Sequence, residues 1–236
     1  MKKLQKLFAK FNYNMRHLLL LFFVFSISNY FAQAFTKKTI VVNANAGIPH
    51  LYKGIVKVAT ETELFKKQFS GKLEIKDFKG INPLFLKAEY GISKYVGIGL
   101  NCAYWNLSFK ALDYYNLLKA GQVIGSDEMD TYQFKISSTS FGIRPNLHIP
   151  FKNDKHDVYL GVALGLTKNK LGIDFSSTDV NKVFPNLKYD LSLPGGFYFA
   201  PTIGYRNYFN EYAGMNLELG FDKGAILQAG FVVRIF

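Results

Sequence analysis

The alternation of apolar with small or polar residues in short segments constrains the fold of this chain more than any other feature. It is cleanest over residues 158–167, which read VYLGVALGLT. A period of two places alternate side chains on opposite faces of a β-strand. Strands that cross a membrane have about 9–11 residues with this alternation and turn the apolar face outward. The segment therefore predicts one strand of a transmembrane barrel.

Similar alternation elsewhere in the chain predicts an all-β fold, an eight-stranded antiparallel up-and-down transmembrane β-barrel. The connections after the first, third and fifth strands are long, and the others are short. Short periplasmic turns and long outer loops are the asymmetry of outer-membrane barrels. With both termini in the periplasm, the long loops and the last hairpin are extracellular. The expected strands cover residues 39–48, 83–92, 95–107, 131–149, 158–167, 195–208, 212–220 and a last segment that ends the chain.

Two places depart from this simple pattern. The alternation changes parity between Ile136 and Phe141, which predicts a β-bulge near residues 137–140. In the first long connection, ordinary loop structure is the expectation, and the alternative is that residues 54–58 and 72–76 extend the first two strands above the membrane as a hairpin. A projecting edge of this kind can pair with a strand of a partner.

Residues 1–34 have the three parts of a secretory signal peptide. A basic start precedes an apolar run over residues 18–25, and the A-x-A signal ending at Ala34 predicts cleavage before Phe35. Met15 is an alternative start, and a retained membrane anchor is the alternative to cleavage. The predicted organisation is a signal peptide, 1–34, followed by one outer-membrane β-barrel domain, 35–236.

The formal net charge of +12 does not indicate a nucleic-acid partner. Much of the charge outside the leader falls in predicted loops, and the chain has no nucleic-acid motif, so solvated loop charge is the expectation. The single cysteine, Cys102, excludes an intrachain disulfide and a Cys-based zinc site. Within the leader, +5 of the charge comes from Lys2, Lys3, Lys6, Lys10 and Arg16.

Several charged residues fall on the inward face of the expected strands. Side chains fill the interior of an eight-stranded barrel, and charges buried there must be paired. We therefore expect Glu89 and Glu218 to pair with cations and the network to plug the barrel, with a gated ion path as the alternative. The predicted interior network consists of Lys87, Glu89, Lys135, Arg144, Arg206, Glu218 and Arg234.

No motif predicts catalysis, a metal site or a cofactor. His50 and Ser108 lie at the outer ends of the first and third expected strands, where they are a candidate acyl-hydrolase pair by position only. A metal site around one periplasmic turn is conceivable, but a solvated turn is the expectation. Its candidate ligands are His148, His156, Asp154 and Asp157.

Over residues 39–236 the chain resembles the OmpA/OmpX-type family of small eight-stranded outer-membrane barrels. The resemblance is carried by residues 86–91, LKAEYG, by residues 216–221, NLELGF, and by the terminal Phe236. It implies a bacterial outer-membrane location, contact with outer-membrane lipids and lipopolysaccharide, and Phe236 as an assembly signal for the barrel-assembly machinery. Strict alternation, however, turns Ile235 to the lipid and Phe236 away from it.

The sequence thus predicts a monomeric, non-enzymatic outer-membrane barrel with a structural or surface-interaction role. Three alternatives remain open at this point. They are a porin-like transporter of small solutes or hydrophobic compounds, an outer-leaflet lipid-modifying hydrolase and, as a rival architecture, a soluble β-sandwich.

Overall fold

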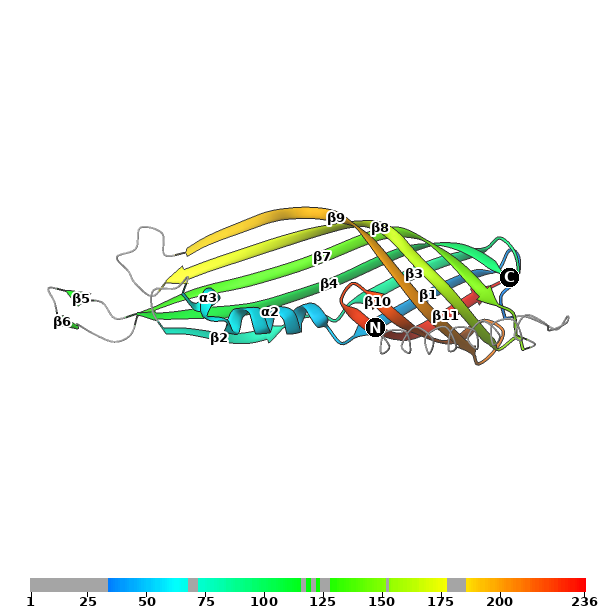
Figure 1. Ribbon diagram of the computed structural model, residues 1–236, viewed down its shortest axis with the longest axis horizontal. Coiled ribbons are helices and arrows are strands. Elements are labelled where there is room, and N and C mark those ends of the chain that lie inside the picture. Colours follow the sequence, from blue (N-terminus) through cyan, green and yellow to red (C-terminus); the bar gives the residue numbers. More distant parts are fainter. Residues whose placement is uncertain are drawn as a thin grey trace, which may run out of the picture.

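The computed structural model describes residues 34–67, 72–115, 118–119, 122–123, 128–151, 153–177 and 186–236. The predicted signal peptide, apart from Ala34, lies outside the described residues. Most of the described chain is antiparallel β-structure, drawn out along one axis (Figure 1).

Eight strands form a closed antiparallel ring in sequence order, which confirms the predicted up-and-down barrel. The ring closes because β4 pairs with β3 on one side and with β7 on the other, while β1 pairs with both β3 and β11. The eight strands are β1 (Ile40–Ile48), β3 (Leu84–Gly91), β4 (Val96–Tyr115), β7 (Glu128–Ile149), β8 (His156–Ser177), β9 (Asn186–Tyr208), β10 (Ala213–Asp222) and β11 (Ala225–Ile235).

The two faces of the ring differ in chemistry. Outward side chains are apolar and exposed, including Leu166 at 70%, Phe197 at 70% and Phe231 at 71% of their full exposure. Inward positions hold small, polar and charged side chains that are buried. A soluble sheet turns its apolar face to a core, whereas this ring turns it outward on every side, as lipid requires. The fold is that of an outer-membrane-type β-barrel.

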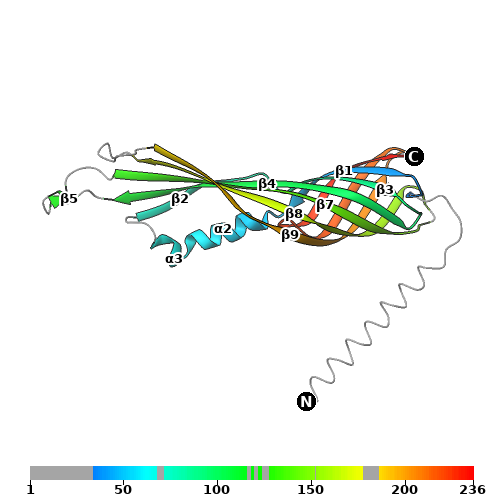
Figure 2. The same ribbon diagram turned by 90° about the horizontal axis from the view of Figure 1, so that it is seen from above.

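Four neighbouring strands continue beyond the ring as an open sheet, here called the extension (Figures 1 and 2). Strands β4, β7, β8 and β9 have 20 to 23 residues, whereas the other ring strands have 8 to 11. An additional strand, β2 (Lys72–Lys79), pairs with the outer half of β4. The segments predicted as the second and third long loops are therefore largely strands, and β5 (Leu118–Lys119) and β6 (Gln122–Val123) form a short pair of their own.

The polarity of the two faces reverses where the extension begins. On β8 the outward positions change from Leu164 and Leu166 to Lys168, while the inward positions change from Thr167 to Leu171. Neighbouring strands change at the same level. The outward face therefore leaves lipid for water at this level, and the inward face changes from a polar lumen to an apolar sheet surface.

This reversal explains the parity change that predicted a β-bulge near residues 137–140. The prediction was wrong, because β7 keeps one continuous register with both β4 and β8. Tyr132, Phe134 and Ile136 lie on the same inward face as Arg144, but above the membrane that face is apolar. The irregularity occurs instead on β9, where the register with β8 shifts between Thr167 and Asn169.

Helices occupy part of the first long connection, where ordinary loop structure was expected and a strand hairpin was the alternative. Residues 54–58 belong to α2 (Leu51–Glu61), which is followed by α3 (Glu63–Lys66). Residues 72–76 do form a strand, but β2 joins β4 rather than a partner from 54–58. His50 is the N-cap residue of α2, because its Nδ1 accepts a hydrogen bond from the Lys53 amide. In the part of the chain that the structure describes, no helix has the length and hydropathy needed to cross a membrane.

Candidate functional site

The half of the barrel interior farther from the extension holds a closed ion network from four strands. The Arg206 guanidinium lies 2.6 Å from Glu89 Oε2 and 2.9 Å from Asp157 Oδ2. His148 lies between the same two carboxylates, with each ring nitrogen 2.7 Å from one of them. Phe35 stacks on the His148 ring at 3.6 Å and is itself buried. Every carboxylate in this cluster therefore has a cationic or hydrogen-bonding partner.

A second cluster lies farther out in the lumen and is centred on Glu218. Lys87 Nζ is 2.7 Å and Arg144 Nη2 is 2.8 Å from the same carboxylate oxygen, Oε2. Lys87 also donates to Gln228 Oε1 at 2.6 Å, and Arg144 donates to Thr202 Oγ1 at 2.6 Å. The side chain of Glu218 is 0% exposed, so its charge depends on these two cations.

Tyr159 joins the two clusters. Its hydroxyl lies 2.8 Å from both Asn216 Oδ1 and Glu218 Oε1. The Arg206 guanidinium sits 4.1 Å from the centre of the same ring, within cation–π range. The aromatic ring fills the middle of the barrel and contacts groups of both clusters.

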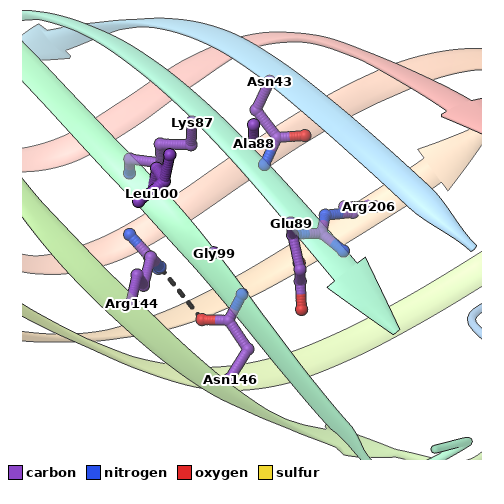
Figure 3. A pocket seen from close by; sticks show the side chains of 9 residues that line it. All are labelled: Asn43, Lys87, Ala88, Glu89, Gly99, Leu100, Arg144, Asn146 and Arg206. Atoms are coloured by element: carbon purple, nitrogen blue, oxygen red, sulfur yellow. Dashed lines mark hydrogen bonds and ion pairs between the residues drawn. The ribbon is translucent and has the colours of Figure 1, made fainter. Parts of the chain in front are cut away.

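The space between the clusters is small. Figure 3 shows the pocket there, with Lys87 and Arg144 toward one side and Glu89 and Arg206 toward the other. Its volume is about 10 Å³, roughly the room that one water molecule needs. This part of the lumen therefore has room for water but not for a larger solute.

Two residues of the predicted network have other surroundings. Lys135 is not in the interior: it lies on the outward face of the extension, where its Nζ pairs with Asp174 Oδ2 at 2.5 Å. The error arose because β7 continues above the membrane, so its residues there do not face a lumen. Arg234 is buried, but it binds backbone carbonyls, among them those of Ala34 at 2.7 Å and Asp154 at 2.9 Å.

Phe236 lies just beyond the last strand and is 64% exposed. Its ring centre is 4.7 Å from the Arg234 guanidinium. The side chain thus does not enter the lumen, although simple alternation turns it away from the lipid.

The interior positions of His148 and Asp157 were missed because both residues were considered only as candidate metal ligands beside a periplasmic turn. Parity was the available signal, since His148 follows Arg144 by four residues on β7 and Asp157 precedes Tyr159 by two on β8. His156 points elsewhere and lies 2.8 Å from the Tyr205 hydroxyl. Among the described residues, no group of His, Cys, Asp and Glu forms a candidate metal site.

His50 does not form a pair with Ser108. Its Nδ1 accepts from the Lys53 amide, and its Nε2 lies 3.2 Å from the Asn106 carbonyl oxygen. These contacts fit the tautomer that carries a proton on Nε2, which donates to the carbonyl oxygen. Both nitrogens are occupied by backbone groups, so the ring serves as a helix cap.

The outward face of the extension carries ion pairs, as expected for a surface in water. Asp174 pairs with Lys135, and Asp77 lies 3.0 Å from Lys110. The hydrogen bond from Lys135 holds the pKa of Asp174 below its usual value, and Lys110 does the same for Asp77. Both acids are therefore ionised at neutral pH, and the face is charged above the membrane boundary.

No protein-family model and no curated protein matches the chain. It is similar to two crystal structures of Ail, the attachment invasion locus protein of Yersinia pestis. One gives a TM-score of 0.32 at 13% identity, over 84% of this chain and 99% of that one. The other, a complex with the heparin analogue sucrose octasulfate, gives 0.33 at 12% identity over the same shares. The assignment as an outer-membrane-type barrel rests on this chain's own strand ring and outward apolar face.

Proposed function

We propose that this chain is a monomeric, non-enzymatic outer-membrane protein that presents its extension at the cell surface in a structural or surface-interaction role. The observation that supports the proposal is the reversal of polarity along the four long strands. It leaves one face of the extension apolar although that face lies above the membrane. Exposed apolar surface of this kind marks sites of interaction.

The apolar face of the extension is covered on one side and open on the other. On β4, Phe109 is 4% exposed and stacks with Phe78 of β2 at 5.1 Å. On β9, Tyr189 and Leu191 are 53% and 50% exposed. An interaction partner would therefore be expected on the β8–β9 side of the extension.

Adhesion of cells that express the protein tests this role. We expect Leu191→Glu to reduce cell–cell or cell–surface adhesion, because it places a charge on the apolar face. Ser192→Glu is the matched control, since the next residue of β9 points to the opposite face. Equal adhesion by both variants and the unchanged protein would contradict the surface-interaction role.

The ion clusters support a plugged rather than a conducting barrel. We expect the purified protein in planar bilayers to show no discrete single-channel conductance. Glu218→Ala would disturb the plug, so it should leave conductance unchanged or raise it. Discrete conductance in the unchanged protein that Glu218→Ala abolishes would instead favour the ion path.

Export and assembly complete the proposal. The predicted signal peptide would deliver the chain to the periplasm, and Phe236 would assist insertion by the barrel-assembly machinery among lipids and lipopolysaccharide. We expect Phe236→Ala to lower the amount of assembled, heat-modifiable protein in the outer-membrane fraction. An unchanged amount of assembled protein would show that Phe236 is not an assembly signal.

A further inference from the structure

A cavity of about 490 Å³ lies where the barrel interior meets the extension. This volume is within the range of small-molecule sites, about 300–1,000 Å³. Its walls come from α2, the four long strands and the turn between β10 and β11. The residues that matter most here are Tyr52, Trp105, Ile136, Leu193, Tyr198 and Lys223.

The upper walls of the cavity are apolar and continue onto the open face of the extension. Tyr52 of α2 stacks on Trp105 of β4 at 4.8 Å. Ile136 of β7 pairs in register with Leu171 of β8, which in turn pairs with Leu191 of β9. A ligand seated in the cavity would thus meet a continuous apolar track that leads outward along the extension.

The floor of the cavity holds a cation, Lys223, in the turn that follows β10. Its Nζ lies 3.5 Å from the centre of the Tyr198 ring and donates a hydrogen bond to Thr167 Oγ1. The residue is 8% exposed, and among the described residues no carboxylate lies within ion-pair distance of the Nζ. Burial lowers its pKa to about 8, against the opposing effect of Asp222. The Asp222 carboxylate acts on this ammonium without forming an ion pair with it, and a buried ammonium that no carboxylate contacts favours an anionic ligand.

The cavity also has a side open toward the outer edge of the lipid-facing band. Strand β10 pairs with β9 only as far as Gly220 and Thr202, so above this level no strand of the described residues pairs with β9 on that side. Phe197, on the unpaired part, is 70% exposed on the outward face and also lines the cavity. Gly196 lines it too, and a Cβ added there would meet nothing within 4 Å.

We propose that this mouth cavity binds a single-chain anionic amphiphile, a long-chain carboxylate, with its head group on Lys223 and its chain along the apolar track. The lone cation matches one negative charge. The aromatic and aliphatic walls match one hydrocarbon chain, and the open edge of β9 would let that chain enter from the outer leaflet. This site goes beyond a surface-interaction role and does not depend on it.

Fluorescence of cis-parinaric acid, with the protein in phosphatidylcholine nanodiscs, tests the proposal. We expect saturable binding that Lys223→Met weakens at least tenfold and that Lys223→Arg largely retains. The methyl ester of the probe should bind the unchanged protein and Lys223→Met alike, because it carries no charge. Lys168→Met is the matched control, since Lys168 follows Thr167 on β8 but lies on the outward face. It should bind the acid as the unchanged protein does.

A second variant tests where the hydrocarbon chain of the ligand binds, and it leaves the charge of Lys223 unchanged. Gly196→Phe would fill open space in the cavity, so it should remove binding of both the acid and the ester while the barrel stays heat-modifiable. Undiminished binding of the acid by folded Lys223→Met, or by folded Gly196→Phe, would overturn the proposal. So would equal weakening by Lys168→Met, because it would indicate general surface attraction of the anion.

Discussion

Inside the barrel, the buried acids Glu89, Asp157 and Glu218 are held by cations from other strands. Parity along the strands predicted the inward positions of Lys87, Glu89, Arg144, Arg206 and Glu218, because the alternation near them is unbroken. It could not predict which cation meets which acid, since that depends on strand register and tilt. The partition into two clusters joined by Tyr159 is therefore visible only in the three-dimensional structure.

Removing the charge of Glu218 should destabilise the barrel strongly. In Glu218→Gln, Lys87 and Arg144 would stay buried without their counter-charge, which costs about 3–5 kcal/mol. Urea unfolding in lipid vesicles measures this loss. Lys135→Met breaks an exposed pair of the extension, and its effect should stay below about 1 kcal/mol. A similar small effect of both variants would show that the Glu218 network does not hold the barrel together.

Binding at the mouth cavity should depend on pH through Lys223. Its pKa of about 8 means that the side chain loses its proton as the pH rises through that value. The other titratable groups around it are Asp222, Tyr52 and Tyr198. Affinity for an alkyl sulfonate, which stays ionised throughout, should be constant below pH 7 and fall above pH 8. Lys223→Met should show no such fall, and an identical fall in both proteins would assign the titration to another group.

The strands illustrate what a hydrophobic pattern can and cannot locate. Alternation predicted the bounds of the ring portions of β3 and β8 to within a few residues. It could do so because the face toward lipid must be apolar and the face toward the lumen is polar or small. Most of the extension on β4, β8 and β9 was predicted to be loop, although the expected strand 131–149 already covered most of its β7 part. Residues 168–177 alternate with the opposite phase and carry Lys168, Lys170 and Asp174. A reversal of phase without a change of register is thus the signature of a strand that leaves the membrane.

The level of this reversal can be tested on β8. Val162 lies outward in the middle of the apolar stretch, so Val162→Arg should cost about 2–4 kcal/mol at the bilayer midplane. Ser176→Arg also faces outward, but above the reversal, and should cost close to nothing. The two variants can be compared by urea unfolding in vesicles. Equal costs would place both positions in the same solvent and contradict the membrane boundary.

At the scale of the whole molecule, the barrel, the plug and the extension form one arrangement. The four long strands run on beyond the closed ring (Figure 2). The ring strands fix the height of the lipid band, the ion clusters close the lumen within it, and the long strands carry an apolar surface beyond it. The closed ring was predictable from the sequence. The mouth cavity was not, because it depends on how α2 and the turn at Lys223 meet strands that are distant in the sequence.

The most direct test of this arrangement is labelling of single cysteines in intact cells with a membrane-impermeant maleimide. In a Cys102→Ser background, Lys188→Cys lies on the outward face of the extension and Lys94→Cys in the turn at the opposite end. We expect Lys188→Cys to react in intact cells and Lys94→Cys to react only after the outer membrane is permeabilised. Reaction of both positions only after permeabilisation, as in a soluble periplasmic protein, would contradict a barrel that spans the outer membrane.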